Sequence, residues 1–77
     1  MLQETKKALK TSAELEAAIK REMQDIGKWS PDIAVAVLPD GPSWKVVIPP
    51  GARVDRDRFE MILLIADRLR SQFSLKR

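Results

Sequence analysis

The hydrophobic positions of this chain form a helical stripe, then two short extended runs, then a second and wider helical stripe. The first stripe consists of four apolar residues at successive spacings of four, four and three: Leu15, Ile19, Met23 and Ile26. That spacing is typical of one face of an α-helix. The segment 11–14 (Thr-Ser-Ala-Glu) matches a capping box, and Gly27 is a C-terminal stop signal. The pattern predicts a helix over about residues 12–26.

The two extended runs, 32–38 and 44–48, predict an antiparallel hairpin. Asp40-Gly41 suits a tight turn, but the prolines on both sides favour a loop longer than two residues. Pairing Val37 with Trp44 puts the larger side chains together on one face: Ile33, Val35, Val37, Trp44, Val46 and Ile48. The opposite face then carries Ala34, Ala36, Leu38, Lys45 and Val47. A slip of one residue would mix the two sets.

The second helix is predicted over about residues 56–73, with Asp55 as its N-cap. One broad arc of this helix is apolar: Phe59, Ile62, Leu63, Ile65, Ala66, Leu69 and Phe73. Met61 and Leu64 fall outside that arc. The helix is therefore more apolar than a single covering partner requires.

Residues 1–10 are predicted to be a flexible tail or a frayed helical extension, because Leu2 and Leu9 do not continue the first stripe. Residues 11–77 are predicted to form a single α+β domain of order αββα, with the hairpin packed against both helices. A dimer could extend the hairpin to a four-stranded sheet.

The composition of the chain excludes several kinds of chemical site. The chain has 77 residues and neither cysteine nor histidine, so disulfides and thiolate or imidazole metal sites are excluded. The commonest general base and the most reactive nucleophile are also missing, and we expect a protein that is not an enzyme and has no cofactor. No segment has the apolar length of a signal peptide or a membrane span, and the expected location is the cytoplasm.

Apolar surface left over by the predicted fold favours a protein partner. With both helices on the large-residue face, Leu38 and Val47 on the other face would stay exposed, as would Met61 and Leu64. Such surface commonly marks an interface, and small domains often gain stability by oligomerising. These four residues are the predicted contact surface of a homodimer. The alternative is that residues 1–10 fold back and cover it.

A second hypothesis uses the basic residues. Lys and Arg number 14 against 11 Asp and Glu, a net charge of +3 with the signs interspersed. Arg53, Arg56 and Arg58 surround the start of the second helix, where an anion could bind. Lys6, Lys7 and Lys10 could add to a nucleic-acid contact. The simpler interpretation is pairing with nearby carboxylates, and therefore we favour a protein-protein interaction module over a nucleic-acid or ribosome-associated protein.

Overall fold

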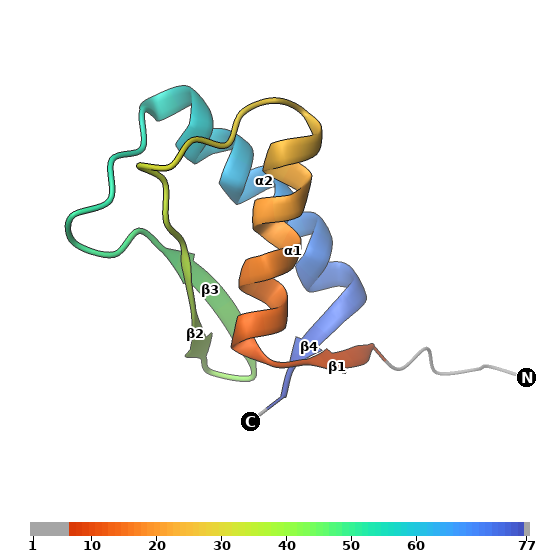
Figure 1. Ribbon diagram of the computed structural model, residues 1–77. Helices are drawn as coiled ribbons and strands as arrows, with labels where there is room; N and C mark the ends of the chain where they lie inside the picture. Colours follow the sequence, from red (N-terminus) through yellow and green to blue (C-terminus); the bar gives the residue numbers. More distant parts are fainter. Residues whose placement is uncertain (1–6, 77) are drawn as a thin grey trace, which may run out of the picture.

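The structure, a computed structural model, describes residues 7–76 and has an α+β fold (Figure 1). It contains two helices, a hairpin and a second two-stranded sheet, which the two ends of the described chain form. In chain order, the elements are β1 (Ala8–Lys10), α1 (Ser12–Asp25), β2 (Ala36–Asp40), β3 (Ser43–Val47), α2 (Arg56–Gln72) and β4 (Phe73–Leu75).

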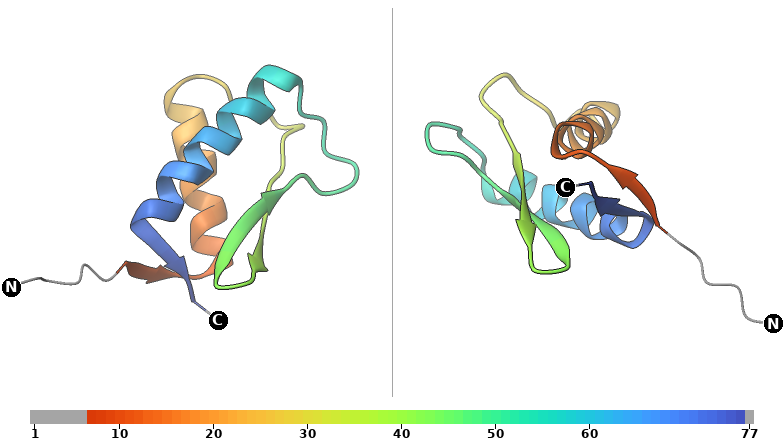
Figure 2. Two further views of the ribbon diagram at one scale, coloured as in Figure 1. Left: turned by 180° about the vertical axis from the view of Figure 1, so that it is seen from behind. Right: turned by 90° about the horizontal axis from the view of Figure 1, so that it is seen from below.

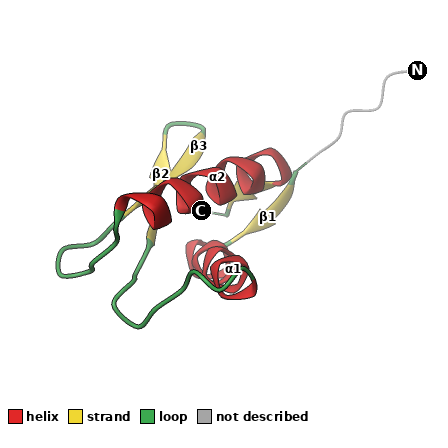
Figure 3. Cartoon of the chain, turned by 90° about the horizontal axis from the view of Figure 1, so that it is seen from above, coloured by secondary structure: helices red, strands yellow, loops and turns green. Residues whose placement is uncertain are grey.

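Both helices cover the same face of the hairpin and cross each other obliquely (Figures 2 and 3). Helix α1 contacts β2 and α2, and α2 in turn contacts β3. One apolar cluster fills the space between them: Leu15, Ile19, Met23, Ile33, Val37, Trp44, Val46, Ile62, Ile65, Ala66 and Leu69. Burial of these side chains is the main driving force for folding.

Helix α1 forms where the sequence pattern predicts it. The Thr11 hydroxyl accepts a hydrogen bond from the Glu14 amide at 3.1 Å, and the Glu14 carboxylate accepts one from the Thr11 amide at 2.9 Å. This reciprocal pair satisfies amides that have no partner inside the helix. The helix ends at Asp25, one residue before the predicted end, and Gly27 then takes a φ of +70°.

The hairpin register differs from the predicted one by two residues. Val37 lies opposite Val46, and Trp44 lies opposite Pro39. A shift of two residues keeps every side chain on its predicted face, because side chains alternate along a strand. Val37, Trp44 and Val46 are accordingly buried against the helices, and Leu38 on the opposite face is exposed.

The predicted long loop of the hairpin is wrong. Asp40 pairs with Ser43, so only Gly41 and Pro42 form the turn. Gly41 has a φ of +58°, which suits the first central position of a type II′ turn, and the second central position needs no amide donor. Pro39 lies opposite Trp44 at a position whose amide would point away from β3, so its missing donor costs no ladder bond.

Residues 8–10 are neither helical nor a tail. They form β1, which pairs in parallel with β4 through Ala8 opposite Phe73 and Lys10 opposite Leu75. The Lys76 amide adds a 2.7 Å hydrogen bond to the Lys10 carbonyl. The cap at Thr11 is extended, with φ −71° and ψ 164°, so the chain enters α1 in strand-like geometry and its backbone groups find partners in the C-terminal segment.

The end of α2 differs from the predicted end for the same reason. Phe73, predicted to be the last helical residue, is extended with φ −132° and ψ 142° and opens β4. Its carbonyl accepts a hydrogen bond from the Trp44 indole nitrogen at 3.2 Å. The rest of the predicted N-terminal extension, residues 1–6, lies outside the described residues.

Both outer edges of the hairpin carry a side-chain contact. The Val37 amide on β2 donates to the Glu16 carboxylate at 2.9 Å, and the Trp44 carbonyl on β3 accepts from the Arg70 guanidinium at 3.4 Å. A second hairpin that paired with either edge would have to displace these contacts. The four-stranded dimer sheet stays a prediction, and these contacts oppose it.

We expect Glu16→Ala to destabilise the protein by about 1 kcal/mol, since the half-buried Val37 amide loses its charged acceptor. Amide hydrogen exchange measured by NMR should show faster exchange at Val37. Glu16→Gln keeps an acceptor oxygen and is the matched control, with exchange close to that of the wild type. Equal exchange in all three proteins would show that the edge contact does not form.

Candidate interaction surface

Large apolar side chains remain exposed on several elements of this small fold. Among residues 7–76, six of them keep more than a third of their surface: Leu9, Ile26, Leu38, Phe59, Leu63 and Leu64. Leu64 is the most exposed of these, at 64%. Single exposed leucines are ordinary on protein surfaces, so the informative question is which of them lie together in a concave site.

Leu64 lies in a groove between α1 and α2. The groove has a volume of about 310 Å³ and is lined by Glu22, Ile26, Met61, Leu64, Ile65 and Arg68. Ile26 is 49% exposed, and Met61 is half-buried against the core. An ion pair between Glu22 and Arg68 joins the two helices beside these apolar groups. The groove thus combines an apolar floor with a charged border, as interfaces commonly do.

The other two predicted contact residues belong to a different surface. Leu38 is 43% exposed on the outer face of the hairpin, and Val47 on the same face is half-buried. Lys45 lies directly opposite Leu38 on the neighbouring strand. Leu9 is 63% exposed, so its side chain does not cover this or any other apolar surface to a large degree, and Leu2 lies outside the described residues.

Ile26 is the groove residue that the sequence pattern assigns wrongly. It continues the stripe of Leu15, Ile19 and Met23, all of which are fully buried, yet it lies beyond the last residue of α1. The adjacent Gly27 is the signal in the sequence, because it marks the end of the helix. A residue at that end extends past the turns that pack against other elements. Phe59 and Leu63, expected in the buried arc of α2, are 36% and 39% exposed.

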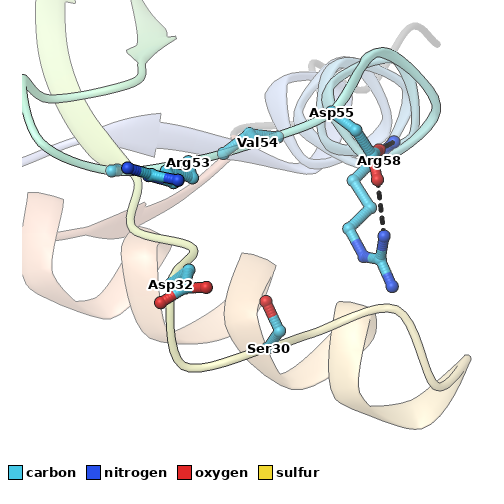
Figure 4. Close-up of a pocket in the computed structure, with 7 residues that line it drawn as sticks. Ser30, Asp32, Arg53, Val54, Asp55 and Arg58 are labelled. Carbon is cyan, nitrogen blue, oxygen red and sulfur yellow. Dashed lines mark hydrogen bonds and ion pairs between the residues drawn. The ribbon is translucent and has the colours of Figure 1, made fainter.

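Two of the three arginines near the start of α2 line an open cavity of about 510 Å³ (Figure 4). Arg53 and Arg58 lie at opposite ends of it. The lining residues are Ser30, Asp32, Ala52, Arg53, Val54, Asp55 and Arg58. Arg56 is not among them and forms a 3.5 Å ion pair with Glu60.

Arg58 is occupied by contacts within the protein. Its guanidinium lies 2.6 Å from an Asp55 carboxylate oxygen and donates from Nε to the Lys28 carbonyl at 2.7 Å. Asp55 in turn caps α2 by accepting from the Arg58 amide at 2.8 Å. A carboxylate therefore already fills the position that an anion would take at this helix start. The arrangement fixes the loop around Lys28 to the beginning of α2.

Within residues 7–76, the other basic candidates are exposed or engaged in a contact with an aromatic ring. Arg53 and Lys7 are exposed, and the Lys10 ammonium lies 4.8 Å from the centre of the Phe73 ring. Lys6 lies outside the described residues. The cavity also contains the carboxylates of Asp32 and Asp55, so its charges are balanced.

Within residues 7–76, no group of three or more Asp or Glu side chains is arranged to hold a metal ion. Over the same residues, neither helix has the length and apolar character needed to cross a membrane. A search for similar proteins finds no match among family models, curated proteins or solved structures.

The hydrogen bonds at Asp55 predict an acid-sensitive part of the stability. The Arg58 amide, and then the Arg58 side chain, lower the pKa of Asp55 from its ordinary value of 3.8. A lowered pKa in the folded state contributes stability above the ordinary pKa, and this is lost as the pH falls through the folded value. The midpoint temperature of thermal unfolding should therefore fall less between pH 7 and pH 2 for Asp55→Asn than for the wild type.

Asparagine is itself a good N-cap, so this variant should stay close to the wild type at neutral pH. Asp40→Asn removes an exposed carboxylate of the hairpin turn and is the control for the loss of one negative charge. A fall in Asp55→Asn as large as that of the wild type would contradict the assignment.

Proposed function

We propose that this protein is a non-enzymatic protein-protein interaction module that self-associates through the groove between α1 and α2. The observation that carries the proposal is the exposure of Leu64, at 64%, beside Ile26, at 49%, in one concave site. Leaving both side chains in water forgoes stabilisation that a complementary surface would provide.

We favour the groove over the outer face of the hairpin because a partner on the hairpin would remove water from a charged group that is unpaired within residues 7–76, whereas a partner in the groove would not. On the hairpin, Lys45 lies directly across from Leu38, so covering that leucine would also remove solvent from an ammonium group. In the groove, the charged neighbours Glu22 and Arg68 are already paired with each other. Covering Leu64 and Ile26 therefore leaves no new charge without a partner.

Symmetry strengthens a contact of this size. In a two-fold dimer each side chain counts twice, so Leu64 and Ile26 of the two copies bring four partly exposed large groups into one interface. Full burial of such a side chain contributes about 1.5–3 kcal/mol, against a substantial cost of association.

Nucleic-acid binding is the rival function, and the arginine contacts weigh against it. Arg56 and Arg58 pair with Glu60 and Asp55, and both Arg53 and Arg56 are exposed, so one of the three arginines is held by contacts at the start of α2. Proteins that bind nucleic acid tend to gather their basic side chains on one face. A salt-dependent shift of the amide signals of Arg53 and Lys7 on adding RNA at low salt would favour the rival.

Leu64→Glu should shift the protein to monomer, because the substitution puts two carboxylates into the proposed contact. Sedimentation equilibrium from about 5 to 500 µM measures the change, with at least a tenfold rise in the dissociation constant expected. Leu38→Glu makes the same substitution at an exposed leucine of the other surface and should keep the wild-type constant.

Circular dichroism should show that both variants are folded, since each leucine is exposed. A wild-type protein that remains monomeric at 500 µM would overturn self-association. Dissociation by Leu38→Glu with no effect of Leu64→Glu would move the interface to the hairpin.

A further inference from the structure

The arrangement of charges around Leu64 indicates how a second copy would dock. We infer that the occupant of the groove is α2 of a second copy, antiparallel to the first, with a two-fold axis passing beside Leu64. The inference rests on the proposed self-association and adds its geometry: each Glu60 would pair with Arg68 of the other copy.

Glu60, Leu64 and Arg68 share one face of α2. Glu60 precedes Leu64 by four residues and Arg68 follows it by four. Since an α-helix turns about 100° per residue, each lies roughly 40° from the direction of Leu64 and about 6 Å from it along the axis. Within residues 7–76, an acid and a base therefore lie at equal distances on either side of the most exposed leucine.

Equal spacing around Leu64 makes this face complementary to itself. When two such helices pack antiparallel about Leu64, Glu60 of each copy lies opposite Arg68 of the other, and symmetry produces the contact twice. In a parallel arrangement Glu60 would face Glu60, and Arg68 would face Arg68. Electrostatics thus favours one orientation and penalises the other.

The positions further along the face are compatible with the same arrangement. Asp57 and Ser71 lie seven residues either side of Leu64, so an acid would face a hydroxyl. Met61 and Asp67 lie three residues either side of Leu64, about 60° from its direction and on opposite sides of it, so each lies at a margin of the contact. The contact between Asp57 and Ser71 brings no like charges together.

Both charged side chains are accessible to a partner. Glu60 keeps 60% of its side-chain surface exposed although it contacts Arg56, and Arg68 keeps 55% although it contacts Glu22. A contact between copies would join these two pairs into a row of four alternating charges: Arg56, Glu60, Arg68 of the second copy and its Glu22. Networks of this kind contribute more than isolated surface pairs.

A cysteine at the proposed axis tests the position of the two-fold. The natural chain has no cysteine, so Leu64→Cys introduces a single thiol. Two such thiols beside a two-fold axis come within the Cα separation of about 4.4–6.8 Å that a disulfide requires. Mild oxidation at 50 µM should give a disulfide-linked dimer of Leu64→Cys at least about tenfold faster than of Leu38→Cys, which carries the same thiol on the hairpin.

Charge reversal tests the orientation. Glu60→Arg alone and Arg68→Glu alone each place like charges opposite one another twice, so each should raise the dissociation constant by roughly tenfold to thirtyfold. Mixed in equal amounts, the two variants should form a heterodimer, because both contacts again join an acid and a base. At 1 M salt surface charges are screened. The rise in dissociation constant of each single variant and the recovery of dimerisation in the mixture should then both be smaller.

Matched charge changes away from the groove provide the control. Asp40→Arg and Arg21→Glu alter the net charge by the same amounts at exposed positions outside the groove lining. Each should dimerise as the wild type does, and their mixture should show no preference for the heterodimer.

The outcomes separate this inference from the proposed function. A wild-type dimer that Leu64→Glu dissociates, with charge reversals that have no effect, keeps self-association and overturns the antiparallel geometry. Rapid crosslinking of Leu38→Cys in place of Leu64→Cys overturns the axis. Heterodimer formation together with fast crosslinking at Leu64→Cys supports both.

Discussion

Trp44 is the residue on which the arrangement of the fold depends. Its side chain is 1% exposed and packs in the single core between the helices and the hairpin. Its indole nitrogen donates to the Phe73 carbonyl, its own carbonyl accepts from Arg70, and the Arg70 guanidinium lies 5.3 Å from its ring centre. One residue of β3 thereby holds the C-terminal end of α2 and the start of β4 in place.

This concentration of contacts matters because the core is small. A chain of this size buries only about 60% of the surface of its unfolded state, and cysteine is absent from the sequence. Each helix therefore contributes a polar contact to the hairpin as well as apolar packing, through Glu16 on α1 and Arg70 on α2. The same contacts occupy one backbone group on each outer edge of the hairpin, the Val37 amide and the Trp44 carbonyl.

The sequence determines the parts of the fold that depend on local pattern. The capping box at residues 11–14 and the N-cap at Asp55 place the helix starts correctly, and the alternation of large and small residues assigns the faces of the hairpin even though its register differs by two. Pro39 and Pro42 favour a longer loop only if their missing amide donors would be needed in the ladder. Neither position requires an amide in the ladder.

Other features depend on partners far along the chain and could not be read locally. Nothing in residues 8–10 indicates that residues 73–75 will lie beside them, so the sequence pattern does not predict β1 and places the end of α2 one residue too late. Among the candidate contact residues, Met61 and Leu64 do share a surface, whereas Leu38 and Val47 lie on another. Only the three-dimensional packing separates the two pairs and adds Ile26 to the first.

The pairing of β1 with β4 has a consequence for the order of folding. Ala8 and Phe73 are 65 positions apart, so this three-residue ladder closes nearly the whole described chain into a ring. Closing so long a loop for so few hydrogen bonds is unfavourable until the intervening helices have packed. The ladder would then be the last element to form and the first to open. Its two strands would detach together as one cooperative unit.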